Sequence, residues 1–297
     1  MSDRYPVGDV SSVKRDLIEA MGTKRKFWFT HTDGTRWLFK YSRPRTGEHW
    51  SEKVAAEIGA QLGIPVARVE LAVCDGVPGA CSKSFLPNEG VLVHGNELLQ
   101  EVDQAYPVTQ LRGVSKHTVD AVFDQLCNVE PPMGSPSSLS AADCFVGYLL
   151  LDALIGNGDR HHENWAVIHD TASRHLAPSY DHASSLGREL LDEARSVRLG
   201  GLDQGRTVDQ YAARASSAFY AKPTDAKPLS PIEAFRLAGR LRPDASAFWL
   251  ARLANLGHDT IESIVYTVPT EVITDPARRF ALAVTAWSRP RLLAVPA

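Results

Sequence analysis

The sequence predicts an α+β fold of two lobes, a small β-rich lobe followed by a larger, mainly helical lobe. Two strand pairs indicate the first lobe: apolar and polar residues alternate on both sides of Asp33-Gly34, and strand-like segments flank Asp75-Gly76. From Leu98 onward, apolar residues recur at helical spacing. We therefore expect a small lobe over residues 1–90, a helical lobe over residues 91–297, and a cleft between them.

The small lobe is expected to contain five strands and one helix. Residues 1–22 are polar at first and then weakly helical from Val13 to Met21. The strand pair around Asp33-Gly34 follows. Next comes a segment that predicts a helix ending at Gly63, because four apolar residues recur at steps of four: Trp50, Val54, Ile58 and Leu62.

The helical lobe is predicted from start signals and from one unusually apolar segment. Ser140 to Asp143 resembles a capping box and opens CFVGYLLLDALIG, which is apolar on nearly all sides and should lie in the centre of the lobe. Ser230-Pro231 starts another helix, and residues 115–128 form a further one. The polar segment after Asp181 is interpreted as a solvated loop, with binding of an acidic or phosphorylated partner as the alternative role of its Arg188, Arg195, Arg198 and Arg206.

Bulk properties exclude several classes of protein. The 297 residues carry a formal net charge of −3, which does not suit a protein that binds nucleic acid through bulk positive charge. The four cysteines form no Cys-x-x-Cys pair, so neither a zinc ribbon nor a thioredoxin-like site is expected. No secretory signal or membrane span is evident, so we expect a cytoplasmic protein with no membrane partner and no direct nucleic-acid binding.

One stretch predicts chemistry. Asp159 is followed five positions later by Asn164, and Asp181 comes after the strand-like segment WAVI. A phosphoryl transferase needs one carboxylate at the acceptor hydroxyl and separate oxygen ligands for Mg²⁺ on the phosphates of ATP. The pattern therefore predicts that Asp159 orients and deprotonates the acceptor, whereas Asn164 and Asp181 bind the metal.

Other interpretations of this stretch have to be weighed. An Asp in Asn-Gly-Asp is often only a turn residue, but here an apolar helix leads into the loop and a second carboxylate follows the next strand. His161 and His162 lack the spacing of a zinc site, and one of them is better interpreted as orienting the loop through a backbone carbonyl or the Asp181 region. Arg160 is expected to neutralise phosphate or to pair with Glu163.

The stretch from Asn157 to Trp165, followed by Ser179-Tyr180-Asp181, resembles the catalytic and metal-binding loops of HipA-like serine/threonine kinases. Its Asp-Arg-His-x-x-Asn core is also similar to that of phosphoinositide 3- and 4-kinases. Arg160 follows the catalytic Asp instead of preceding it, and Asp-His-Ala stands where protein kinases have Asp-Phe-Gly. The resemblance implies a bilobal, protein-kinase-like fold with ATP in the cleft.

The resemblance also assigns residues of the small lobe. Lys40, on the second strand of the first hairpin, would hold the α and β phosphates, and Glu48 on the next helix would pair with it, with Glu52 as the alternative. Gly22 and Thr23, in a glycine, hydroxyl and basic cluster before a strand, either cover the phosphates or form a solvated turn. The hinge that holds adenine is expected near Phe85 to Asn88, with Phe85 and Leu86 at the nucleotide.

Three functions remain open from the sequence. The first is an ATP- and Mg²⁺-dependent, HipA-like Ser/Thr protein kinase, for which Ser11, Ser12 and Thr23 are weak candidates for autophosphorylation. The second is a kinase of a small molecule or lipid, and the third is a nucleotide-binding pseudokinase or partner-binding module. The partner is thus a protein or small-molecule hydroxyl acceptor. An antitoxin-like regulator is only weakly expected, because the extra N-terminal subdomain common in the HipA family is expected to be missing.

Overall fold

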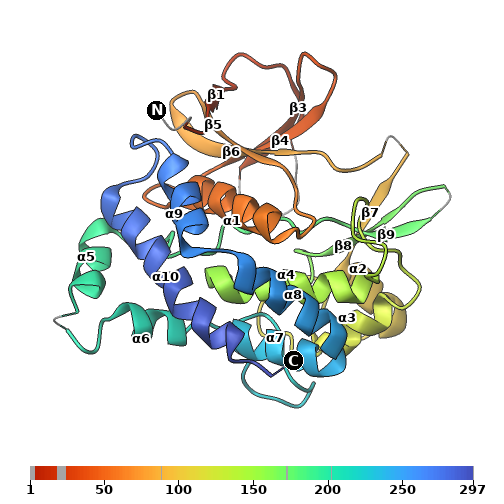
Figure 1. The fold of residues 1–297 in the computed structure, drawn as a ribbon. Helices are drawn as coiled ribbons and strands as arrows, with labels where there is room; N and C mark the ends of the chain where they lie inside the picture. Colours follow the sequence, from red (N-terminus) through yellow and green to blue (C-terminus); the bar gives the residue numbers. More distant parts are fainter. Residues whose placement is uncertain (1–3, 19–24, 88, 172, 202, 297) are drawn as a thin grey trace.

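A computed structural model gives the fold of the chain and describes residues 4–18, 25–87, 89–171, 173–201 and 203–296. Its N-terminal part is a β-sheet that lies over one helix, and its C-terminal part is mainly helical (Figure 1). The predicted α+β arrangement of a small β-rich part and a larger helical part is therefore confirmed.

The N-terminal sheet has six strands in the order β1-β5-β6-β4-β3-β2. Strand β1 is parallel to β5, and the other pairs are antiparallel. The predicted hairpin around Asp33-Gly34 and the strand pair around Asp75-Gly76 are both confirmed. The strands are β1 (Val7–Asp9), β2 (Arg15–Ile18), β3 (Lys26–Thr30), β4 (Arg36–Tyr41), β5 (Val69–Cys74) and β6 (Val77–Lys83).

The predicted weak helix from Val13 to Met21 is wrong where the structure describes it. Residues 15–18 form strand β2, and residues 7–9 form β1, so the sheet has one strand more than expected. Both strands lie at the edges of the sheet and satisfy the backbone groups of β5 and β3. Pairing with an existing strand edge outweighs a weak local helical pattern.

Helix α1 (Glu48–Leu62) supports the sheet and confirms the predicted helix. The side chains of Trp50, Val54, Ile58 and Leu62 are all buried, and the helix contacts β5 and β6. Gly63 ends the helix in the left-handed conformation, with a φ of 74°. Because α1 is buried on several faces, its polar side chains also lie inside the protein, which is essential for the site described below.

The helical part is built around α4 (Ala141–Ile155), which begins with the predicted capping box at Ser140. Helix α4 is buried along its whole length and contacts α1, α7, α8 and α10 (Figure 1). A Cβ on Gly147 would lie 2.6 Å from the ring of Trp249, so glycine permits the close approach of α8. The remaining helices are α2 (Gly95–Val102), α3 (Val119–Gln125), α5 (Asp192–Gly200), α6 (Val208–Ala213), α7 (Pro231–Leu241), α8 (Pro243–Asn255), α9 (His258–Thr267) and α10 (Asp275–Leu293).

A second sheet belongs to this part and joins β7 (Val91–His94), β8 (Ala166–His169) and β9 (Arg174–Leu176) in that order. Strand β7 is the first element after residue 90, and it pairs with β8. The division between residues 90 and 91 stays a prediction. Among the helices that the structure describes, none combines the length and the hydrophobicity that crossing a bilayer requires.

Because α4 is central, a substitution that leaves a cavity beside it should destabilise the fold. The Leu150 side chain is fully buried, so Leu150→Ala should lower the free energy of unfolding by about 2–5 kcal/mol. Leu241→Ala, at a helical leucine that is 42% exposed, is the matched control and should change it by less than about 1 kcal/mol. Urea denaturation followed by circular dichroism measures both. Equal effects of the two substitutions would contradict the central role of α4.

Candidate active site

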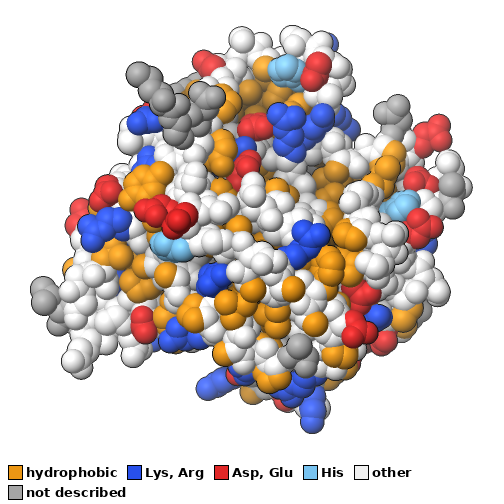
Figure 2. All heavy atoms as spheres, viewed as in Figure 1, with side chains coloured by type: hydrophobic (Ala, Val, Ile, Leu, Met, Phe, Trp, Pro, Cys, Tyr) orange, Lys and Arg blue, Asp and Glu red, His pale blue; other side chains and the backbone are white. Residues whose placement is uncertain are grey.

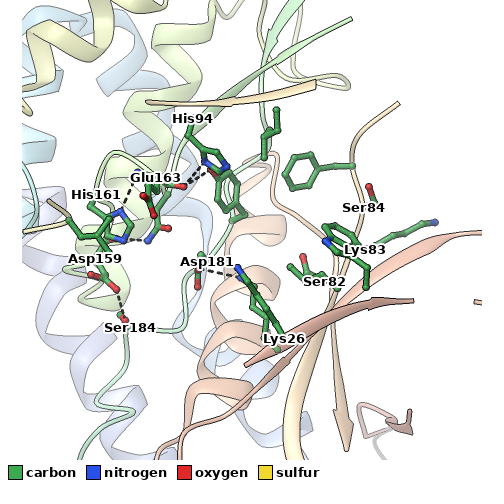
Figure 3. A pocket seen from close by; sticks show the side chains of 18 of the residues that line it. Lys26, Ser82, Lys83, Ser84, His94, Asp159, His161, Glu163, Asp181 and Ser184 are labelled. Carbon is green, nitrogen blue, oxygen red and sulfur yellow. Dashed lines mark hydrogen bonds and ion pairs between the residues drawn. The ribbon is translucent and has the colours of Figure 1, made fainter. Parts of the chain in front are cut away.

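A cavity of about 640 Å³ lies between the N-terminal sheet and the helical part. Figure 2 shows side chains of both charge signs close together beneath the sheet, in the upper part of the view. The sheet contributes Leu38 and Lys40, among others, to the wall of the cavity. The helical part contributes three residues that were predicted to carry the chemistry, Asp159, Asn164 and Asp181. Figure 3 shows Asp159 and Asp181 among the side chains that line the cavity.

The loop after α4 is held by its own polar groups. Helix α4 ends at Gly156, whose φ is 68°, and the Asn157 side chain then donates to Asp152 at 2.8 Å. The backbone N–H of Asp159 donates to the Asn157 side chain at 3.1 Å, and the amide of Asn164 donates to the Asp159 carbonyl at 2.6 Å. Because the Asn164 nitrogen makes that bond, its side-chain oxygen is left to serve as a ligand.

Arg160 fastens this loop to α4. Its guanidinium is buried and donates to both carboxylate oxygens of Asp152, to the Ser179 hydroxyl at 2.9 Å and to the Asn164 carbonyl at 3.1 Å. The expectation that Arg160 neutralises phosphate or pairs with Glu163 is therefore wrong. A fork of N–H donors suits this role because it reaches a helix and two loops at once.

Asp181 lines the same cavity from the segment that follows β9. Its backbone has a φ of 57°, a left-handed conformation that non-glycine residues adopt seldom, and its carboxylate lies 3.2 Å from the ammonium of Lys40. Ser179, two residues earlier, exchanges backbone hydrogen bonds with the segment that follows α1, because its N–H donates to Pro65 and its carbonyl accepts from Ala67. Both lobes therefore hold the Asp181 loop.

Lys40 is surrounded by three acids, Asp181, Glu52 and Glu48. Burial alone lowers the pKa of Lys40, but the charges of these acids, with Asp181 the largest contributor, raise it above its ordinary value. The lysine therefore stays charged inside the cleft. A half-buried cation beside a carboxylate suits the binding of phosphate and Mg²⁺.

Glu48 and Glu52 have different partners. The Glu48 carboxylate accepts hydrogen bonds from the Arg43 backbone at 2.9 Å and from Arg188 at 2.7 Å. Glu52 lies one turn further along α1 and accepts from the His182 backbone at 2.9 Å, while its second oxygen is buried with no hydrogen-bond partner. Lys40, Glu48 and Glu52 line one small cavity of about 20 Å³. Glu52 thus offers Lys40 an oxygen that no other group uses.

The inner end of the main cavity is apolar. Leu38, Leu86 and Leu92 line it together with Phe85, whose ring stacks on Tyr180 with centroids 5.8 Å apart. Phe85 and Leu86, the residues expected at the hinge, thus lie at this cavity. The expected hinge residue Asn88 and the expected phosphate-covering residues Gly22 and Thr23 lie outside the described residues.

The two histidines of the loop orient it locally. His162 is buried, its ring lies 2.9 Å from the Tyr106 hydroxyl, and burial lowers its pKa to about 4. His161 accepts a hydrogen bond from the Glu163 backbone at 3.2 Å. Within the described part of the chain, no group of three His, Cys, Asp or Glu side chains is placed to hold a metal ion.

Two further residues contact Asp159 directly, and a third contacts it through one of these two. The sequence predicted a role at Asp159 for none of the three. Ser184 donates to one carboxylate oxygen at 3.0 Å, and Arg112 lies 3.1 Å from the other. Arg188 donates to Ser184 at 3.2 Å, and its side chain is only 15% exposed, so its expected place in a solvated loop is wrong. Neither the spacing nor the composition of these segments signals the contacts, which arise from tertiary packing.

The buried pair at the base of the loop yields a stability prediction. Asp152→Ala leaves the Arg160 charge without its main partner, so the free energy of unfolding should fall by about 3–5 kcal/mol. Asp124→Ala replaces an exposed aspartate of α3 and should change it by less than about 0.5 kcal/mol. Urea denaturation of both variants is the measurement. A loss at Asp152→Ala no larger than that of the control would contradict the anchoring role.

The chain is similar to known proteins in sequence and in fold. The family model described as the HipA-like C-terminal domain matches residues 18–229. No curated protein matches the chain. The solved structure of a Helicobacter pylori proinflammatory kinase, CtkA, superposes with a TM-score of 0.76 at 18% identity, and the match covers 98% of this chain and 97% of that one.

The HipA protein of Shewanella oneidensis MR-1, solved with HipB and its operator DNA, gives a TM-score of 0.54 at 16% identity. The match covers 98% of this chain and 66% of that one. At such identities the two structures show a shared fold, which confirms the predicted kinase-like architecture. The family model covers well over half of the chain, and the chain therefore belongs to the HipA-like C-terminal domain family, a kinase-like family whose members use a nucleotide.

Proposed function

We propose that the chain is an Mg·ATP-dependent kinase that transfers the γ-phosphoryl group to a serine or threonine hydroxyl of a protein. The observation that carries this proposal is the gathering of Lys40, Asp159, Asn164 and Asp181 on one cavity, whose wall also includes apolar side chains against which a purine ring can pack. A pseudokinase has no need of a base and two metal ligands in one place, so this gathering favours transfer over nucleotide sensing alone.

Asp159 is the proposed general base. Its side chain is 26% exposed at the cavity, so an acceptor hydroxyl can reach it from solvent. The acceptor oxygen forms a bond to the γ-phosphorus while the bond between that phosphorus and the oxygen of ADP breaks, and the hydroxyl proton passes to Asp159. The surrounding loop contributes by holding the carboxylate still, since Arg160 and Asn164 fix the backbone on both sides of it.

Asn164 and Asp181 are the proposed Mg²⁺ ligands. An amide oxygen and a carboxylate are hard donors of the kind that Mg²⁺ prefers, and each lines the cavity from a different loop. The amide nitrogen of Asn164 is occupied by the Asp159 carbonyl, which determines that its oxygen faces the other way. Bound Mg²⁺ would neutralise part of the phosphate charge, and Asn164 and Asp181 would hold it there.

Lys40 is proposed to exchange partners when the nucleotide binds. Its present partner, Asp181, is needed by Mg²⁺, so the ammonium becomes available to the α and β phosphates. Glu52 is then the acid that keeps Lys40 in position, because one of its oxygens is buried without a hydrogen-bond partner. Of the two glutamates considered from the sequence, we therefore propose Glu52 in place of Glu48.

The choice of a protein acceptor rests on the family likeness. The chain resembles a protein described as a kinase over nearly the full length of both. A regulator of the antitoxin type is the weakest part of the proposal, since it rests on the fold shared with the Shewanella HipA that was solved with HipB. A cytoplasmic location is part of the same proposal.

The carboxylates at the cavity yield the first functional prediction. Asp159→Asn should slow loss of the γ-phosphoryl group from Mg·ATP by roughly 10²–10⁴-fold because the base is removed. Asp181→Asn should abolish the dependence on Mg²⁺ together with most of the rate. Label lost from [γ-³²P]ATP, counted as phosphoprotein and as inorganic phosphate, measures both.

Asp120→Asn, at an exposed aspartate of α3, is the matched control and should retain the wild-type rate. Wild-type protein that does not consume Mg·ATP, whether or not it binds the nucleotide, would overturn the proposed function. So would Asp159→Asn and Asp181→Asn variants that are as active as this control.

A second prediction separates the two glutamates of α1. Glu52→Gln should raise the dissociation constant of Mg·ATP about 10-fold or more, because a buried charge partner of Lys40 is lost. Glu48→Gln should leave that constant within about twofold, since its carboxylate binds Arg43 and Arg188. Isothermal titration calorimetry with an ATP analogue measures both constants. The opposite pattern would restore Glu48 as the partner of Lys40.

A further inference from the structure

The two oxygens of the Asp159 carboxylate are held in very different ways. One oxygen lies 3.1 Å from the guanidinium of Arg112, whose side chain is 82% exposed. The other accepts a hydrogen bond from the Ser184 hydroxyl at 3.0 Å inside the cavity (Figure 3). An exposed arginine exchanges its contact with solvent at little cost, so Arg112 can be displaced, whereas the Ser184 contact is partly buried.

Ser184 is the first member of a chain of contacts that leads to the N-terminal part. Arg188 donates to the Ser184 oxygen at 3.2 Å through one arm of its guanidinium. The other arm donates to Glu48 at 2.7 Å, and the Glu48 side chain is only 3% exposed. Glu48 opens helix α1, and the N–H of Gly47 just before it donates to the Arg188 carbonyl at 2.8 Å. Both the side chain and the backbone of Arg188 are therefore attached to the start of α1.

The chemistry of these groups fixes the direction of each hydrogen bond. A serine hydroxyl has one proton and two acceptor lone pairs, and a guanidinium can only donate. Because Arg188 takes an acceptor position on Ser184, the single Ser184 proton is left for Asp159. Glu48 accepts a hydrogen bond from Arg188 and balances its charge. Hydrogen bonds that involve an ionised group are shorter and stronger than those between neutral groups.

The turn between Ser184 and Arg188 brings the two side chains together. Leu186 and Gly187 both have positive φ values, of 57° and 71°, and the Arg188 N–H donates to the Ser185 carbonyl at 3.1 Å. A Cβ on Gly187 would lie 2.5 Å from the ring of Phe280 in α10, so the turn is packed against the helical part. The turn that carries Ser184 and Arg188 therefore contacts both lobes.

We propose that Ser184, Arg188 and Glu48 form a positioning relay for Asp159 in the proposed phosphoryl transfer. The relay fixes one carboxylate oxygen, so the other, from which Arg112 is displaced, receives the acceptor proton. It also makes the orientation of the base depend on the first turn of α1. This role of Glu48 is separate from the pairing with Lys40 that we assign to Glu52.

The test compares Ser184→Ala, Arg188→Gln and Glu48→Gln with the wild type in kcat and in KM for ATP. Loss of label from [γ-³²P]ATP to any acceptor, water included, is the readout. Each substitution should lower kcat roughly 10- to 100-fold, as a small misplacement of a catalytic group does, with KM changed less than about twofold. The Ser184→Ala/Arg188→Gln double variant should lose no more than the worse single variant, because the residues act through one contact.

Matched variants separate positioning from folding. Ser184→Thr keeps the hydroxyl and should recover most of the rate. Glu193→Gln and Arg206→Gln change exposed residues of the following segment and should leave both constants unchanged. The relay is overturned if Ser184→Ala retains the wild-type kcat, or if KM rises in parallel with the loss of kcat in all three variants. A wild type that binds Mg·ATP without consuming it would instead contradict the proposed function, and the relay with it.

Discussion

The buried pair of Asp152 and Arg160 is the interaction on which the rest of the site depends. Asp152 belongs to α4, the central helix, which contacts α1, α7, α8 and α10, and Arg160 belongs to the loop that follows. The pair is buried, so a separation of the two side chains would leave each charge unpaired away from solvent, at a cost of several kcal/mol. The pair therefore holds the loop in place against α4. Asp159 and Asn164 belong to the same loop, on either side of the arginine, so the pair positions both of them.

A second constraint is the balance of charge in the cleft. Lys40 lies near three acids, Asp181, Glu52 and Glu48, and their charges raise its pKa. On the proposed function, Mg·ATP would bring a divalent cation to Asp181 and phosphates to Lys40. We propose that these charges would replace the contact between Lys40 and Asp181 when the nucleotide binds.

Much of the fold was predictable because local patterns and tertiary packing agree in it. The hairpin around Asp33-Gly34, helix α1 and the capped start of α4 all carry strong signals, and all are confirmed. Strands β1 and β2 were missed because only their partners in the sheet define them. Arg160 was misinterpreted for a related reason, since the sequence shows its neighbours in the loop but not Asp152 on the helix below.

The site was predictable to the extent that its residues are close in sequence. Asp159, Asn164 and Asp181 lie within one short stretch, and the structure brings them to one cavity together with Lys40. The contacts between Ser184, Arg188 and Glu48 span up to 140 residues of the chain, a separation over which spacing carries no signal. The sequence therefore predicted Glu48 as a partner of Lys40, whereas its buried contact with Arg188 is visible only in the structure.

The most direct test is a crystal structure of the protein with Mg²⁺ and a non-hydrolysable ATP analogue. We expect the metal between the side-chain oxygens of Asn164 and Asp181, and the adenine against Phe85 and Leu86. The Lys40 ammonium should have moved from Asp181 to the phosphates, with Glu52 behind it. A nucleotide bound outside this cavity, or phosphates that contact neither Lys40 nor the metal ligands, would contradict the account.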